Sequence, residues 1–213
     1  MLCKICQNNT ISFFHQFLSK DYFYCHACEF ISLYDAFVVD LEKEKAQYGN
    51  HHNSLENEGY VKMFEDFMDL FWDMLTCKEI HALDFGSGPT PVLAKLLERR
   101  GATVDCYDKF YQPETIFEMQ TYDLITSTEV FEHLENPLET LKMLTNHLKP
   151  NGIIAIMTLF HPNDTELFLK WWYPRDPTHI SFFTCKTLDI LGKKCGLKRI
   201  SEDGKRVVVF QKE

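Results

Sequence analysis

Four cysteines near the start of the chain have the types and the spacing of a metal site. Cys3 and Cys6 form one CxxC pair, Cys25 and Cys28 form a second, and eighteen residues separate the two pairs. Each pair can present two thiolates to one ion, and two pairs complete the tetrahedron that Zn²⁺ prefers. All four positions are thiols and leave no place for water. The pattern therefore predicts a structural zinc ribbon over residues 1–35, whose small core the metal would stabilise.

Two alternatives stay open for this segment. A redox CxxC is one of them, although such a motif does not need a second CxxC at ribbon spacing. The other is a metal-binding role for His26, which lies between Cys25 and Cys28. We expect His26 to be an exposed residue of the knuckle rather than a ligand.

A second group of residues, from Asp84 to Gly88, could hold a nucleoside. The run Asp-Phe-Gly-Ser-Gly follows an apolar-rich stretch and precedes a stretch with helical character. Strand, glycine turn and helix form a unit in which backbone N–H groups meet a ligand, and Gly86 and Gly88 allow close approach because they lack a Cβ. Asp108 lies twenty residues beyond Gly88, the separation expected of an acid that hydrogen-bonds a ribose diol.

The glycine turn also excludes two kinds of cofactor. A dinucleotide fingerprint would have a third glycine at position 91, where this chain has Pro91. The turn is not followed by Lys-Ser or Lys-Thr, so it is not a Walker phosphate loop. A cofactor that has a ribose and no phosphate fits these residues better.

These motifs resemble the class I S-adenosylmethionine (SAM)-dependent methyltransferases, in their small-molecule, quinone-type branch. The resemblance covers roughly residues 79–212 and rests on residues 84–88, on the fourth-strand motif at 122–134 and on the turn at 148–152. It implies SAM as cofactor and transfer of a methyl group to O or C of a small molecule. The cofactor-binding residues that it implies are Asp84, Gly86, Ser87, Gly88, Asp108, Thr128 and Glu129.

Two histidines are the best candidates for a catalytic base that takes a proton from the acceptor. An unperturbed imidazole titrates near the pH at which most enzymes operate. His133 follows the fourth strand, and His179 lies in the loop 174–184, which we expect to face it. Each histidine could instead be structural, and Asp176 and Glu132 are alternative carboxylate partners.

The elements around these residues predict an α/β fold with a Rossmann-like, doubly wound, mostly parallel sheet and an antiparallel C-terminal edge hairpin, plus the small ribbon. Only residues 109–121 lie between the second strand and the next, too few for a strand–helix–strand crossover, so this edge should be abbreviated. The predicted strands span 78–83, 102–108, 122–130, 153–159, 197–201 and 206–211. The predicted helices span 58–75, 91–100, 137–148, 165–173 and 186–195.

We divide the chain into a zinc ribbon at 1–35, a connector at 36–57 and a methyltransferase domain at 58–213. The connector could be a solvated linker, or it could fold over the cofactor, as the corresponding segment does in related methyltransferases, and bring Tyr48 or Tyr60 to the site. Five aromatic residues could wall an acceptor pocket or belong to the core or to a dimer contact: Trp171, Trp172, Tyr173, Phe182 and Phe183.

Charge favours a small acceptor over a nucleic acid. The formal net charge is −9, with −1 in residues 1–35, −12 in 36–185 and +4 in 186–213. The acidic body repels phosphates. The alternatives are an RNA methyltransferase that uses the ribbon and the basic C-terminal segment, and a non-catalytic SAM-fold binding protein. We expect a cytoplasmic protein without a membrane span, and nothing in the sequence indicates an oligomeric state.

Overall fold

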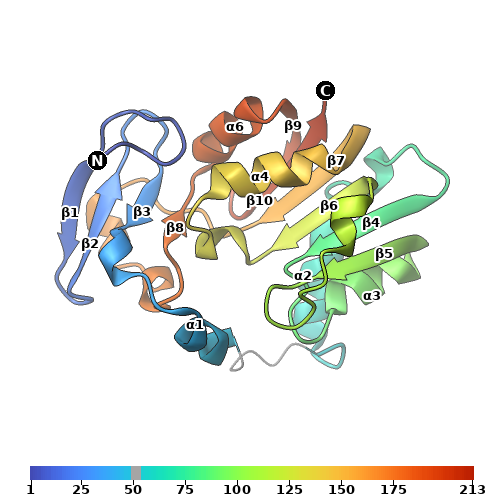
Figure 1. Ribbon diagram of the computed structural model, residues 1–213, viewed down its shortest axis with the longest axis horizontal. Helices are drawn as coiled ribbons and strands as arrows, with labels where there is room; N and C mark the ends of the chain where they lie inside the picture. The colour runs from blue at the N-terminus through green and yellow to red at the C-terminus, as the bar shows by residue number, and fades with distance from the viewer. Residues whose placement is uncertain (49–53) are drawn as a thin grey trace.

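The computed structural model describes residues 1–48 and 54–213. The strands form two sheets, one of six strands in the order β5-β4-β6-β7-β10-β9 and one of four in the order β1-β2-β3-β8 (Figure 1). The larger sheet carries the predicted glycine turn, and the smaller one contains the N-terminal segment. Within the described residues, no helix has the length and apolar character needed to cross a bilayer.

The six-stranded sheet has the predicted α/β architecture. Its strands β5, β4, β6 and β7 run parallel, and β10 and β9 add an antiparallel edge. The strands are β4 (Ile80–Phe85), β5 (Ala102–Tyr107), β6 (Tyr122–Thr128), β7 (Leu148–Met157), β9 (Leu197–Glu202) and β10 (Val207–Lys212). The predicted mostly parallel sheet with a C-terminal hairpin is confirmed.

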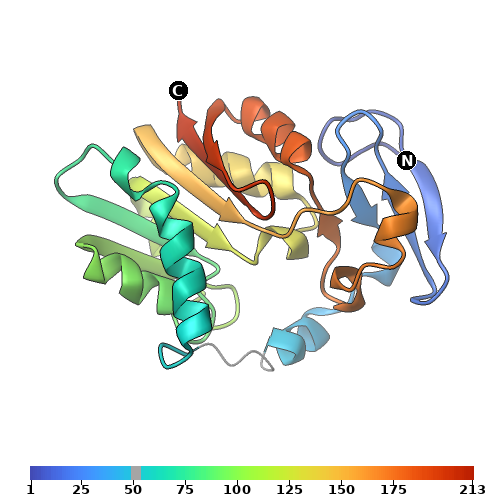
Figure 2. The ribbon, with the colours of Figure 1, turned by 180° about the vertical axis from the view of Figure 1, so that it is seen from behind.

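Helices cover both faces of this sheet because its buried strands alternate between two cores. Ala82 and Leu124 pack with α2 (Glu58–Asp69) and α3 (Val92–Arg99). The next residues, Leu83 and Ile125, pack with α4 (Pro137–Asn146) and α6 (Cys185–Lys194). Successive side chains of a strand point to opposite faces, so each strand contributes to both cores. Figure 2 shows α2 lying across the first face.

The sheet ends at β5, as the short spacing predicts. Residues 108–121 form a loop with one 3-10 turn, η3 (Ile116–Met119), before β6 begins. Asp108 and Gln112 hydrogen-bond each other through their backbones in this loop, with N···O distances of 3.0 Å in both directions. An irregular loop thus lies where a third strand and its helix would stand in a longer chain.

The N-terminal sheet contains a strand from the far end of the chain. Its strands β1 (Ile11–His15), β2 (Lys20–Tyr24) and β3 (Ile31–Leu33) are joined by β8 (Ser181–Phe182), which pairs antiparallel with β3. In both ribbon views, β8 runs beside the N-terminal strands (Figures 1 and 2). The unit predicted for residues 1–35 is therefore completed by a segment of the predicted methyltransferase part.

Three predicted segments differ from the structure. The connector contains the turn η1 (Asp35–Phe37) and the helix α1 (Leu41–Tyr48), and the predicted helix at 58–75 ends at Asp69, before the turn η2 (Trp72–Met74). The predicted helix at 165–173 is wrong: α5 (Thr165–Phe168) is one turn, followed by η5 (Tyr173–Arg175). Phe168 and Tyr173 are both buried in one core. Residues five apart do not share a helix face, so a regular helix could not bury both.

Candidate active site and cysteine cluster

The glycine turn lies at the carboxyl end of β4, where it packs closely against the loop that follows β6. Gly86 has φ +87° and Gly88 has φ +67°. A Cβ at Gly86 would lie 2.1 Å from Cγ2 of Val130. Position 86 therefore requires glycine both for its left-handed backbone and for this contact. The turn offers backbone rather than side chains to whatever occupies the end of the strand.

Asp108 holds the glycine turn to the loop after β5. Its Oδ2 accepts a hydrogen bond from Gly88 N at 3.0 Å, and its Oδ1 accepts from Phe110 N at 2.8 Å and from Tyr111 N at 3.1 Å. The side chain is buried at 6% exposure. Asp108 thus stands beside the turn, as the spacing predicts, and its carboxylate already has three backbone donors. Its predicted contact with a ribose diol stays a prediction.

Asp84 lies beneath the turn at the end of β4. Its Oδ1 accepts a hydrogen bond from Oγ1 of Thr126 in β6 at 3.2 Å. Burial raises the pKa of Asp84 to about 7. A carboxyl group of this kind is costly to leave charged in the interior, so its retention at a strand end is typical of a functional position.

Glu129 and Glu132, after the end of β6, share the hydroxyl of Tyr173. Tyr173 Oη donates to Oε1 of Glu132 at 2.5 Å and lies 3.4 Å from Oε2 of Glu129. Glu129 has φ +54°, and its N–H donates to Met157 O at 2.8 Å. Burial, together with the charge of Glu129, raises the pKa of Glu132 well above its usual range. Burial therefore favours the neutral form of Glu132 over its carboxylate. Thr128, the last residue of β6, directly precedes this pair.

The structure brings His133 and His179 together, with ring centroids 4.8 Å apart. His133 Nδ1 lies 3.1 Å from Thr178 O, and His179 Nδ1 lies 2.9 Å from Tyr173 O. A carbonyl oxygen can only accept, so Nδ1 is the protonated nitrogen in both rings and Nε2 is the acceptor atom when a ring is neutral. Burial, together with His179, lowers the pKa of His133 to about 3, so this ring is neutral near pH 7.

The alternative carboxylate, Asp176, braces the loop that carries His179. Its Oδ1 accepts from Thr178 N at 2.9 Å and from Thr178 Oγ1 at 2.6 Å, and its Oδ2 accepts from Gln47 of α1 at 3.1 Å. Asp176 thus joins the loop to α1. Its hydrogen bonds suit a residue that holds the loop in place.

Helix α1, in the described part of the connector, lies against the site. Tyr48, at the end of α1, has its ring centroid 5.0 Å from that of His133 and 5.7 Å from that of Phe110. Tyr60 packs on Phe64, and burial together with the charges of Asp84 and Glu129 raises its pKa. The two tyrosines flank the two ends of the site, Tyr48 beside the histidines and Tyr60 near the acids.

A family profile described as "Methyltransferase domain" matches residues 60–202. The chain belongs to the methyltransferase-domain family. It is 28% identical over 90 residues to the ubiquinone biosynthesis O-methyltransferase of Photobacterium profundum, covering 42% of this chain and 38% of that protein. It is 33% identical over 84 residues to the malonyl-[acyl-carrier protein] O-methyltransferase of Halalkalibacterium halodurans, covering 39% and 27%. The chain thus spans less than two fifths of the length of these curated relatives.

Solved methyltransferases share the fold of this chain. Magnesium protoporphyrin IX methyltransferase from Synechocystis PCC 6803, solved with bound SAH, superposes with a TM-score of 0.53 at 11% identity, covering 81% of this chain and 94% of that one. An O-methyltransferase family protein from Burkholderia thailandensis superposes with a TM-score of 0.52 at 14% identity, covering 84% and 64%. At such identities the likeness concerns the fold alone.

A cavity of about 840 Å³ opens beside His133 in this chain. It lies between α1, the loop after β6 and the loop of His179, and Leu134, Thr178 and Ile180 are part of its wall. Four carboxylates line it: Asp40, Glu42, Glu44 and Glu135. Lys109 also lines it and pairs with Glu44 at 2.5 Å. The volume suits a small molecule, and the charge of the wall is unfavourable to anions.

The four N-terminal cysteines gather at one point, as their spacing predicts. Cys3 Sγ lies 3.5 Å from Cys28 Sγ, and Cys6 Sγ lies 3.4 Å from Cys25 Sγ. All four are free thiols, and their sulfurs lie within 4.8 Å of one another. Four thiolates about 2.3 Å from one zinc ion would lie about 3.8 Å apart, so the cluster fits a tetrahedral site. His26 is exposed and packs on Tyr24.

The five predicted pocket aromatics divide between several places. Phe182 and Phe183 are buried in two different cores, and Trp172 is 61% exposed. Tyr173 contacts the site, but through its hydroxyl and its carbonyl rather than as an aromatic wall. The sequence offers no signal for this hydrogen-bonding role, since a tyrosine before a proline is equally consistent with packing. Residues from the connector, such as Gln47 and Glu44, are also functional candidates that a polar linker composition conceals.

Proposed function

We propose that the protein is a SAM-dependent methyltransferase that acts on O or C of a small molecule. The observation that carries this proposal is the 840 Å³ cavity, which is lined by His133 and by Lys109, the residue after Asp108, in a chain whose residues 60–202 match a methyltransferase domain. Gly86 and Gly88 both have positive φ and form a turn of partly exposed backbone at a strand end, which suits a cofactor that approaches the backbone. Gly86, Ser87 and Gly88, with Asp84, Asp108, Thr128 and Glu129, would hold the cofactor.

SAM, when bound, supplies an electrophilic methyl group. The residues of this chain bind and orient the acceptor, exclude water and receive a proton. His179 and His133 are the candidate bases, since each carries its proton on Nδ1 and offers Nε2 as acceptor atom in the neutral ring. Burial and the charge of Glu129 raise the pKa of Glu132, which favours its neutral form and makes it a weaker candidate than the histidines. Tyr48 closes the His133 side of the site.

The cavity favours an acceptor without negative charge. Its four carboxylates face one lysine, which is itself paired with Glu44. A phosphate-rich polymer would be repelled at this entrance. An RNA methyltransferase is the second candidate, and the specific observation in its favour is the charge of +4 in residues 186–213. That segment forms α6, β9 and β10, at the edge of the large sheet.

We further propose that Cys3, Cys6, Cys25 and Cys28 bind one structural zinc ion, in a ribbon that spans residues 1–35. The support is that four free thiols lie close together and can fill all four positions of a tetrahedral zinc ion, which leaves no position for water. Elemental analysis should find about one zinc per chain. The remaining divisions, a connector at 36–57 and a methyltransferase domain at 58–213, follow from the same proposal.

Calorimetric titration with SAM, S-adenosylhomocysteine and NAD tests the cofactor. The first two should bind and NAD should not, because the turn lacks the third glycine. Transfer of a tritiated methyl group to fractionated metabolite pools and to total RNA then tests the acceptor. Label in the small-molecule fraction is expected. Label in RNA, or submicromolar RNA binding that weakens steeply with salt, would place the RNA candidate first.

A further inference from the structure

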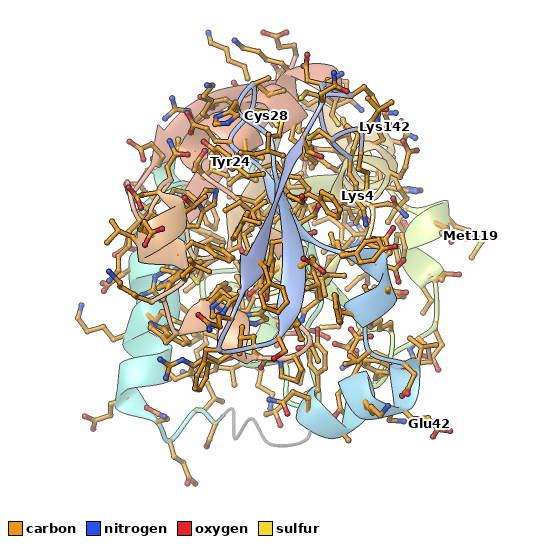
Figure 3. The ribbon with its side chains drawn as sticks, turned by 90° about the vertical axis from the view of Figure 1, so that its left-hand side faces the viewer. Lys4, Tyr24, Cys28, Glu42, Met119 and Lys142 are labelled. Carbon is orange, nitrogen blue, oxygen red and sulfur yellow. The ribbon has the colours of Figure 1, made fainter. Side chains whose placement is uncertain are left out.

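The ribbon and the acceptor loop form one sheet. Ile31 and Ser32 of β3 pair with Phe182 and Ser181 of β8, and Leu33 N donates to Ile180 O at 2.9 Å. The acceptor loop, which we define as residues 173–182, therefore ends as a strand of the cysteine-bearing unit. Figure 3 faces this unit and shows Cys28 in its upper part and Glu42, on α1, at the lower edge of the molecule.

The other side of the acceptor loop is bound to the loop that follows β6. Ile180 N donates to Glu132 O at 2.8 Å, and Ser181 Oγ donates to Leu134 O at 2.6 Å. The loop is thus held between two partners, the ribbon on one side and the end of β6 on the other. If the hydrogen bonds to either partner were broken, the carbonyls of Thr178 and Tyr173, which set the tautomers of His133 and His179, could move.

More hydrogen bonds join the ribbon to the segment beyond the loop, and they come from residues beside the cysteines. Thr187 Oγ1 donates to Cys28 O at 2.8 Å. Glu29 O lies 2.7 Å from His161 Nε2, and the Glu29 carboxylate accepts from Thr184 Oγ1 at 2.9 Å and pairs with Lys186 at 3.2 Å. The backbone that a metal would fix at Cys28 therefore continues directly into Glu29, and these two residues make the contacts with the segment beyond the loop.

The cofactor side is held by different hydrogen bonds, while Leu83 and Phe85 of β4 share one apolar core with Cys28. Gly88 N donates to Asp108, and Gly86 N donates to Tyr107 O at 2.7 Å. These bonds lie between neighbouring strand ends of the large sheet. They do not pass through the ribbon.

We propose that the metal-bound ribbon is a positioning element of the acceptor site. It holds β8, and through β8 it fixes the carbonyls that orient His133 and His179. Loss of the metal loosens residues 173–187 and leaves the cofactor side in place. This inference rests on the structural zinc and the acceptor site proposed above.

Hydrogen exchange of the full-length protein, compared between two regions, tests the proposal. Cys25→Ser should lose zinc and speed backbone exchange in residues 178–187 by about tenfold or more, because the opening there becomes local. Exchange in α3, on the cofactor side, should keep its wild-type rates, and calorimetry should give wild-type SAM affinity. The same pattern should follow when zinc is removed from the wild type with a chelator.

A second variant keeps the cysteines and breaks the contacts next to them. Glu29 has φ +65°, a conformation that asparagine tolerates, so Glu29→Asn keeps the backbone and removes the carboxylate that holds Thr184 and Lys186. It should retain zinc and speed exchange around residues 184–187. Asp35→Asn is the matched control, because it breaks the pair of Asp35 with Lys4 within the N-terminal part of the chain. It should leave exchange in residues 178–187 unchanged.

The outcomes separate this inference from the proposals beneath it. If the wild-type protein contains no zinc, the proposal of a structural zinc is wrong. If the wild-type protein does not bind SAM, the proposed function is wrong. A zinc-free Cys25→Ser variant with wild-type exchange in residues 178–187 would overturn the positioning role. Equal acceleration in α3 and in residues 178–187 would overturn it too, since the ribbon would then stabilise the whole molecule without preference.

Discussion

On the proposed cofactor side, the glycine turn follows β4, Asp108 follows the adjacent strand β5, and the two hydrogen-bond each other directly. On the acceptor side, His133 and His179 come from distant segments and are oriented by carbonyls of a loop that the ribbon also holds. The first arrangement follows from the sheet alone. The second requires three separate parts of the chain to be in place, so we expect that changes there can abolish acceptor binding and leave the proposed cofactor site intact.

The largest effect on stability is expected from a substitution of Asp84, on the proposed cofactor side. Burial raises its pKa from 3.8 to about 7, so between these values the folded chain keeps a proton that the unfolded chain has lost. The free energy of unfolding therefore falls as the pH rises through this window, by up to about 4 kcal/mol. Asp84→Asn cannot ionise. It should match the wild type near pH 4 and exceed its stability by up to about 4 kcal/mol at pH 8 in urea unfolding.

The same variant should bind SAM more weakly, since the proposed site loses its acid. Greater stability with weaker binding would show that the cofactor side retains Asp84 at a cost in stability. If the difference in unfolding free energy between the two proteins does not change with pH, Asp84 is not the group that titrates.

The next prediction separates two reasons for glycine at position 86, the close contact with Val130 and the positive φ. Gly86→Ala places a Cβ 2.1 Å from Val130 Cγ2 at φ +87° and should lower the free energy of unfolding by about 2–4 kcal/mol. Gly101 is the matched control, because its φ is +98° but a Cβ there meets nothing within 4 Å. Gly101→Ala should cost about 1 kcal/mol, measured in the same urea titrations. Equal losses would contradict the close packing of the turn.

Asp108 and Asp176 provide the direct comparison of the two sides. Asp108→Ala removes the acceptor of three backbone hydrogen bonds and the predicted ribose acceptor, and hydrogen bonds to charged groups contribute about 1.5–3 kcal/mol. SAM affinity should fall about 10- to 150-fold in calorimetry. Asp176→Ala, on the acceptor side, should leave SAM affinity within about twofold of wild type, an effect below 0.5 kcal/mol. A large loss of SAM affinity in Asp176→Ala would show that the two sides are not independent.

The sequence predicts the placement of the glycine turn and of Asp108 well because its signals there are local. The strand, the two glycines and the acid at residue 108 are close in the chain, and each follows a rule of backbone geometry or strand order. The structure of the proposed acceptor side does not follow from such local rules. β8 has two residues, too few for a periodic signal, and it exists because β3 pairs with it. Likewise α1 and the hydrogen bonds of Tyr173 depend on tertiary contacts that composition does not encode.

The smallest effect concerns two buried tyrosines that differ in their hydroxyls. Tyr173 Oη donates to Glu132, whereas Tyr22 Oη, in the ribbon sheet, has no hydrogen-bond partner among the described residues. Tyr173→Phe leaves the buried Glu132 carboxyl without this donor and should lower the free energy of unfolding by about 1–2 kcal/mol. Tyr22→Phe removes an unsatisfied hydroxyl and should leave stability unchanged or raise it by up to about 1 kcal/mol.

Both variants keep the aromatic ring and the backbone carbonyl, so His179 should keep its Nδ1–H tautomer in Tyr173→Phe. Nitrogen-15 chemical shifts of the imidazole report that tautomer. An altered tautomer in Tyr173→Phe would show that the hydroxyl, and not the carbonyl, orients His179. A loss in Tyr22→Phe as large as in Tyr173→Phe would show that Tyr22 has a partner, and the acceptor side would then depend on the ribbon through a buried hydrogen bond as well as through β8.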